Sequence, residues 1–174
     1  MAVFEITLYG NPILKKKCET VTDFKALAPL VNNMLDTMYE EEGIGLAANQ
    51  IGIDLHLLVI DVSHIEDTDG HLVITNGEII NRTSDLNMEE GCLSLPGIRF
   101  DVKRPEEITL RYQTISGATK VEEFNGMLAR VIQHEIDHLN GVLMIDRVSP
   151  LVKMQFNQEL KEIEKLGKKQ SPKT

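Results

Sequence analysis

Two histidines four residues apart, with a glutamate directly after the first, could form part of a metal centre. They are His134, Glu135 and His138, within "QHEIDHLNG" at positions 133–141. Residues i and i+4 lie on one face of a helix, so both imidazoles can bind one ion. The glutamate then lies where it can accept a proton from metal-bound water. The pattern indicates a metal-dependent hydrolase; a histidine pair on a solvated helix surface is the alternative.

A third ligand is needed, because two imidazoles alone do not complete a protein metal site. In "EEGCLSLPG", positions 89–97, Cys92 lies between a glycine and a turn-rich segment, so its sulfur could be displayed at a strand end. A thiolate at about 2.3 Å and two imidazoles at about 2.0 Å form a tetrahedral set with one open position. Most free cysteines are instead small buried hydrophobes. Because the histidine pair lacks a third ligand, we favour coordination by Cys92.

The stretch "GIGLAANQIG", positions 43–52, follows a predicted helix and is rich in small residues. Gly43 and Gly45 permit the close approach of another chain, and the two alanines indicate tight packing. Gln50 is a candidate donor to an oxyanion that develops during a reaction. A glycine-rich turn without a chemical role is the alternative.

The composition is that of an ordinary soluble protein, with 174 residues, 42% hydrophobic and 26% charged. We expect one catalytic domain over residues 1–166 and a disordered basic tail over 167–174. A net charge of −9 argues against nucleic acid as the main partner. Two distant cysteines, Cys18 and Cys92, predict no disulfide framework and favour a reducing cytoplasm. We find no secretory signal, and no apolar run approaches the roughly 20 residues of a membrane span.

Apolar periodicity predicts a helix over residues 23–42, and cap signals predict a second helix over 125–139. A final helix is expected over 149–166, with four inward-facing candidates: Leu151, Met154, Leu160 and Ile163. Between the first two helices, β-type runs are expected at 56–61, 72–81, 98–103, 107–115 and 119–124. Because these strands are consecutive, they predict an α+β fold. We expect antiparallel β-sheets packed around the central metal-binding H-E-x-x-H helix, with an N-terminal helix and a C-terminal helix.

Three motifs, "GIGLAANQ", "EGCLS" and "QHEIDHLNG", resemble in order and spacing those of the peptide deformylases. The resemblance extends from "YGNPIL" near the start to "DRV" at 146–148, nearly all of the chain. It is to the bacterial and organellar type without long insertions. Arg130 stands where an apolar residue is common, and "GIRFD" is a variable loop. These departures bear on substrate preference and not on the reaction.

The resemblance implies an enzyme that removes the N-formyl group from N-formylmethionyl nascent polypeptides and releases formate. Metal-bound hydroxide would attack the formyl carbon, with Glu135 as general acid and base. The Gln50 amide and, by resemblance, the backbone N–H of Leu93 would stabilise the oxyanion together with the metal. One divalent ion, Fe(II) in the cell or Zn(II), Ni(II) or Co(II) in its place, would be held by Cys92, His134 and His138.

The same resemblance implies where the substrate binds. Its backbone would lie beside the strand at 43–46 and the segment near Ile98, as an added strand. Its methionine side chain would lie in an apolar pocket, and methionines lining that pocket adapt to a thioether. The substrate-binding positions are Gly43, Ile44, Gly45, Leu46, Met88, Glu90, Met127 and Val131. Nascent chains at the ribosome would be the partner, for a cytoplasmic monomer.

Two other classes of protein remain open from the sequence. A zincin-like peptidase uses the same helix but more often takes its third ligand from a downstream His or Glu, and the Cys92 motif counts against it. A non-catalytic protein with a structural metal would close its site with four protein ligands. No fourth candidate with suitable spacing is present in the sequence.

Overall fold

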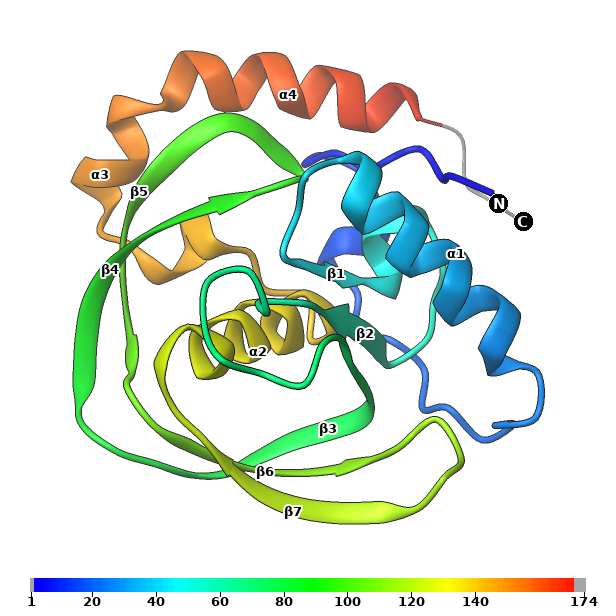
Figure 1. The fold of residues 1–174 in the computed structure, drawn as a ribbon. Helices are drawn as coiled ribbons and strands as arrows, with labels where there is room; N and C mark the ends of the chain where they lie inside the picture. Colours follow the sequence, from blue (N-terminus) through cyan, green and yellow to red (C-terminus); the bar gives the residue numbers. More distant parts are fainter. Residues whose placement is uncertain (1, 171–174) are drawn as a thin grey trace.

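Two antiparallel sheets surround one helix in the computed structural model, which describes residues 2–170 (Figure 1). The larger sheet has the strand order β1-β2-β3-β6-β7, and β4 and β5 form a separate two-stranded hairpin. The strands are β1 Gly45–Ala47, β2 Leu57–Ile60, β3 Leu72–Arg82, β4 Asp85–Cys92, β5 Leu95–Pro105, β6 Ile108–Gln113 and β7 Thr119–Phe124. The α-helices are α1 Leu27–Glu40, α2 Gly126–Leu139, α3 Pro150–Gln155 and α4 Asn157–Lys169. This is the predicted α+β fold.

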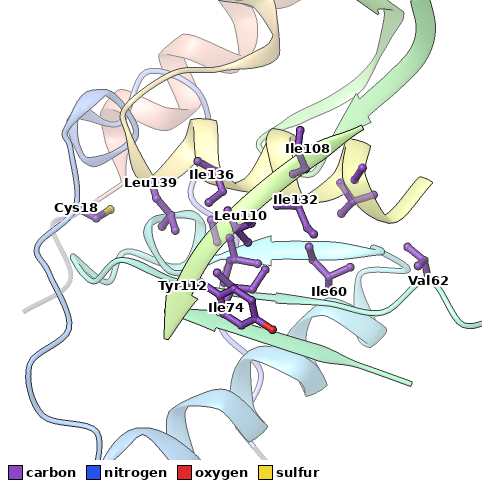
Figure 2. Close-up of a cluster of buried hydrophobic side chains, with 14 residues drawn as sticks. Cys18, Ile60, Val62, Ile74, Ile108, Leu110, Tyr112, Ile132, Ile136 and Leu139 are labelled. Carbon is purple, nitrogen blue, oxygen red and sulfur yellow. The ribbon is translucent and has the colours of Figure 1, made fainter. Parts of the chain in front are cut away.

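Helix α2, which contains the H-E-x-x-H pattern, lies at the centre of the fold. Every residue from Ala129 to Leu139 is buried, and the helix contacts β1, β2 and β5. Its apolar face, with Ile132 and Ile136, packs on the inner face of the larger sheet (Figure 2). Each such isoleucine contributes about 1.5–3 kcal/mol of burial free energy. The polar residues of α2 therefore lie inside the protein, held by apolar packing on the opposite face.

Strands β1 and β2 are buried on both faces. Ala47, Leu58 and Ile60 pack on the α2 side. Leu46 and Val59 pack on the other side, in the cluster that includes the inner face of α1. Successive side chains of a strand point to opposite faces, so residues on either side of Leu46 face α2. Figure 1 shows α1 lying outside these two strands.

The hairpin β4–β5 was only partly predicted. Strand β5 covers the expected run at 98–103, but β4 was not expected as a strand, because five of its eight residues are exposed and polar positions dominate it. A half-exposed two-stranded ribbon lacks the alternation that reveals a strand covering a core. The missed strand carries Cys92 at its end.

The predicted final helix is divided in two at Phe156, where α3 ends and α4 begins. Leu160 and Ile163 are buried as expected, whereas Leu151 and Met154 are 74% and 69% exposed, so those two inward assignments were wrong. Both exposed residues belong to α3, which has no buried residue. The chain changes direction at this break. The residues of α3 therefore do not continue the periodicity that places Leu160 and Ile163 on the inner face of α4.

The expected disordered tail is also wrong for residues 167–170. Helix α4 continues to Lys169, and Gly167 packs so closely on the N-terminal segment that a Cβ would lie 2.1 Å from the carbonyl oxygen of Tyr9. The Gln170 side chain accepts from the backbone N–H of Leu8 and donates to the carbonyl of Ile6, each at 2.8 Å. The last four residues, 171–174, lie outside the described residues. Within residues 2–170, no helix combines the length and the apolar character needed to cross a bilayer.

The first turn of α2 is capped from a distant loop. Asn125 precedes the helix but makes no side-chain cap. The carboxylate of Glu66 instead accepts hydrogen bonds from the backbone N–H groups of Met127 and, at 3.3 Å, Leu128. A carboxylate at this end of a helix satisfies unpaired N–H groups and complements the helix dipole. Glu66 therefore fixes the start of the helix that carries both histidines.

We expect Glu66→Gln to lower the free energy of unfolding by about 0.5–2 kcal/mol, the usual value of a lost helix cap. Urea denaturation monitored by circular dichroism measures the difference. Asp67→Asn is the matched control, since Asp67 is the next carboxylate in the loop and is exposed. Equal stability of the two variants would show that Glu66 does not stabilise the helix start.

Candidate functional site

The structure brings the three predicted metal ligands together. Cys92 lies at the end of β4, and His134 and His138 lie one turn apart on α2. The Cys92 Sγ atom is 3.2 Å from Nε2 of His138, and the two histidine Nε2 atoms are also 3.2 Å apart. All three ligand atoms lie within 4.8 Å of one another. The helical spacing explains the histidine pair, and the hairpin supplies the sulfur.

These residues fit a divalent metal ion. Ligands on a tetrahedron of this type lie about 3.3–3.6 Å apart, close to the separations found here. Burial and the neighbouring His134 lower the pKa of His138 well below its usual value, which keeps its ring neutral and able to coordinate. Among residues 2–170, no other His, Cys, Asp or Glu joins this group. Three ligands with sulfur from the hairpin disfavour both a closed structural site and a zincin-like peptidase.

Glu90 orients His134 by binding the ring nitrogen that does not face Cys92 and His138. The carboxylate of Glu90 is 2.9 Å from Nδ1 of His134, and it accepts from Arg104 Nε at 2.6 Å and from Arg130 Nη1 at 2.6 Å. Burial would raise the pKa of Glu90, but the bonds from His134 and Arg104 lower it to about 2. The ionised carboxylate accepts a hydrogen bond from Nδ1–H, so Nε2 of His134 offers its lone pair toward Cys92 and His138.

Two arginines tie the hairpin to α2. Arg104 of β5 bridges Glu90 of β4 and Asp137 of α2, donating to Asp137 at 2.8 Å. Arg130 of α2 donates to the carbonyls of Leu86 at 2.6 Å and Val102 at 3.0 Å, one on each strand of the hairpin. These bonds fix β4 relative to α2. They therefore determine where the cysteine at the end of β4 lies relative to the two histidines.

Glu135 and Gln50 lie beside this group. Glu135 is buried, and burial raises the pKa of its carboxyl to about 7. Its Oε2 atom has no hydrogen-bond partner among the described residues. The side-chain oxygen of Gln50 accepts a hydrogen bond from the backbone N–H of Ala47 at 2.9 Å. This bond directs the side-chain nitrogen of Gln50 to Ser94 Oγ at 3.2 Å and Cys92 Sγ at 3.8 Å.

A cavity of about 510 Å³ opens onto these side chains. One wall is the segment 43–45, where a Cβ on Gly45 would lie 2.7 Å from Val131 and 2.8 Å from Glu135 Oε1. Glycine is therefore required there for β1 to approach α2. Within residues 2–170, β1 pairs only with β2, so its other edge can accept an extended chain. The cavity is lined by the ligands His134 and Cys92 and by nine of the predicted catalytic and substrate positions: Gly43, Ile44, Gly45, Gln50, Glu90, Leu93, Met127, Val131 and Glu135.

Two predicted substrate positions do not line this cavity. The Leu46 side chain is fully buried on the α1 side of β1, because the strand alternates and its neighbours face α2. Met88 is 37% exposed on β4 and pairs with Val102 across the hairpin. Met88 therefore lies outside the predicted methionine pocket. Leu46 was predicted as part of the strand beside the substrate backbone, and that stays a prediction. Arg130 also lines the cavity.

Sequence reasoning missed the charged residues behind the ligands, namely Arg104, Asp137 and Arg147. Arg147 donates to Asp137 Oδ1 at 2.6 Å and completes that carboxylate's bonding. The alternation of β5 could have revealed Arg104. Ile98, Phe100, Val102 and Arg104 form its buried face, and an arginine in that series requires a buried carboxylate. The sequence interpretation also missed Ser94 beside Gln50, and no feature of the sequence marks this residue.

The comparisons with known proteins agree along nearly the whole chain. A family profile described as "Polypeptide deformylase" matches residues 3–154. The chain is 43% identical to a peptide deformylase of Thermodesulfovibrio yellowstonii over 92% of this chain and 98% of that relative. It is 44% identical to one of Acidobacterium capsulatum, covering 96% of this chain and 99% of the relative. The crystal structure of peptide deformylase from Thermus thermophilus matches with a TM-score of 0.88 and 39% identity, over 95% and 99% of the two chains.

We expect Glu90→Gln to weaken metal binding about 10- to 100-fold, because His134 loses the carboxylate that orients it. The variant should also lose about 3–5 kcal/mol of stability, because Arg104 and Arg130 are left buried without their anion. Chelator competition and denaturant unfolding measure the two effects.

Glu89→Gln is the matched control, since Glu89 is the preceding residue and its exposed side chain pairs with Arg99 on the surface. That variant should bind metal as the wild type does. Wild-type metal affinity in a folded Glu90→Gln variant would contradict the positioning role of Glu90.

Proposed function

We propose that this chain, which belongs to the polypeptide deformylase family, catalyses the family's reaction at the site formed by Cys92, His134 and His138. The chain is a hydrolase that removes the formyl group from N-formylmethionyl peptides and releases formate. One observation carries the proposal: three ligands, a buried carboxylate with one oxygen unpartnered among the described residues, and a fixed amide donor open onto the same cavity. A structural metal site would have no use for the last two.

The three ligands would hold one divalent ion with one position free for water and substrate. When bound, such an ion polarises water and the formyl carbonyl. A donor set of one thiolate and two imidazoles accepts several first-row metals, so metal availability selects among them. We propose Fe(II) in the cell, with Zn(II), Ni(II) or Co(II) able to take its place.

Glu135 would move the proton in both halves of the reaction. Its carboxylate accepts the proton as a water oxygen bonds to the formyl carbon, and returns it to the amine as the C–N bond breaks. A pKa of about 7, raised by burial, suits a group that must take and return a proton near neutral pH. The missing hydrogen bond at Oε2 leaves that atom free to do so.

Gln50 and the backbone N–H of Leu93 would donate to the oxyanion that forms on the formyl oxygen. The Gln50 amide group is held on one side by the Ala47 N–H, so its nitrogen faces the cavity before substrate binds. A donor fixed in this way is worth on the order of 3 kcal/mol in the transition state. Leu93 directly follows Cys92 and lines the same cavity.

The substrate backbone would add to the free edge of β1, opposite the segment near Ile98. Its methionine side chain would lie among Ile44, Met127 and Val131, with Glu90 and His134 at the walls. We further propose that the substrates are nascent chains at the ribosome, met by a cytoplasmic monomer. The free thiols of Cys18 and Cys92 suit a reducing compartment.

We expect Glu135→Gln to keep the metal and lose about 10²- to 10⁴-fold in kcat, because the amide cannot accept the water proton. Formate release from a formyl-Met peptide and metal content per chain are measured together. Glu159→Gln, an exposed carboxylate on α4, is the control and should match the wild type in both. A Glu135→Gln enzyme with near wild-type kcat would rule out this proton-transfer role. A wild-type protein that binds metal but releases no formate would reject the proposed site as a whole.

A further inference from the structure

A second cavity, of about 560 Å³, lies against a different face of α2 and shares no lining residue with the first. On the helix it is lined by Gln133, Ile136, Asp137 and Asn140. Its other walls are the bulged part of β3, the end of β5, and segments that include Lys17, His56 and Arg147. The mechanism proposed above does not use this cavity.

The charge of its lining is opposite to that of the whole chain, which has a net charge of −9. Two carboxylates line it, and both already have partners: Asp137 binds Arg104 and Arg147, and Glu78 binds Arg111. The five cationic side chains in the lining are Lys17, Arg82, Lys103, Arg104 and Arg147.

Three of these cations, Lys17, Arg82 and Lys103, make no ion pair with any carboxylate of the described residues. They come from three separate segments and face one cavity. Like charges gathered without counter-charges repel one another, and an anion between them removes that repulsion. These exposed cations give the cavity a positive potential, which attracts a negatively charged ligand.

A buried histidine, His56, also belongs to the cavity lining. Its side chain is nine-tenths buried in the cavity wall, and its Nδ1 atom has no hydrogen-bond partner within the described residues. Asn140 already bonds to the ring, and the charge of Lys17 acts on it.

We propose that this cavity binds a phosphoryl group, as free phosphate, as pyrophosphate or at the end of a small phosphate ester. Guanidinium and ammonium donors that line one cavity from several segments suit the oxygens of a phosphoryl group. The lining contains no Phe, Tyr or Trp, so it offers no stacking surface for a base.

Isothermal titration of the metal-loaded enzyme with inorganic phosphate, pyrophosphate and ADP, at constant ionic strength, tests the proposal. We expect one site per chain, with Arg82→Glu/Lys103→Glu weakening it tenfold or more. Lys120→Glu/Lys165→Glu makes the same change in net charge at exposed positions outside the cavity lining, and should stay within about twofold of the wild type. Unchanged formate release by both double variants shows that they are folded.

The outcomes separate the alternatives. Tighter binding of pyrophosphate than of ADP identifies a free phosphate ligand, and the reverse order identifies an ester. Phosphate bound at the metal would be unaffected by Arg82→Glu/Lys103→Glu, so equal affinity of that variant and the wild type overturns the proposal. Equal weakening in both double variants would show only general charge attraction and overturns it as well, as does the absence of binding to the wild type.

Discussion

The buried carboxylate of Glu90 is the interaction on which the site depends. It receives hydrogen bonds from two arginines and from His134, and so joins β4, β5 and α2 at one point. Burying one such charge is costly, and the cost is recovered only when every partner is in place. The network therefore favours one arrangement of hairpin and helix. That arrangement is the one in which the sulfur of Cys92 meets two imidazole nitrogens.

The second constraint is the burial of α2 at the centre of the fold. Its apolar face packs on the larger sheet, and the polar residues of its other faces border the two cavities. Burial has opposite consequences for neighbouring polar groups of the helix. It raises the pKa of Glu135 toward neutrality, and it keeps His138 neutral and able to coordinate. The same packing that stabilises the helix thus sets the chemistry of its side chains.

The sequence was informative where function depends on local spacing. The H-E-x-x-H pair requires only a helix, so the positions of His134 and His138 followed from the chain alone. Cys92 could be proposed as third ligand only because the pair lacked one. The direction of strand side chains was harder to predict. Leu46 faces α1 because of its position in the alternation of β1. Met88 lies on β4, a strand that was not predicted because polar residues dominate it. The alternation of β5 marks Arg104 as buried, but no local pattern identifies Asp137 as its partner.

X-ray absorption spectroscopy of the protein reconstituted with Zn(II) tests the central claim most directly, because it counts the atoms that bind the metal. The hairpin and the helix together should give one sulfur at about 2.3 Å and two imidazole nitrogens at about 2.0–2.1 Å. One further light atom at the open position should complete the shell. In Cys92→Ala the sulfur neighbour should disappear, whereas Cys18→Ala should leave the spectrum unchanged. A spectrum without sulfur in the wild type, or with four protein ligands, would contradict the account.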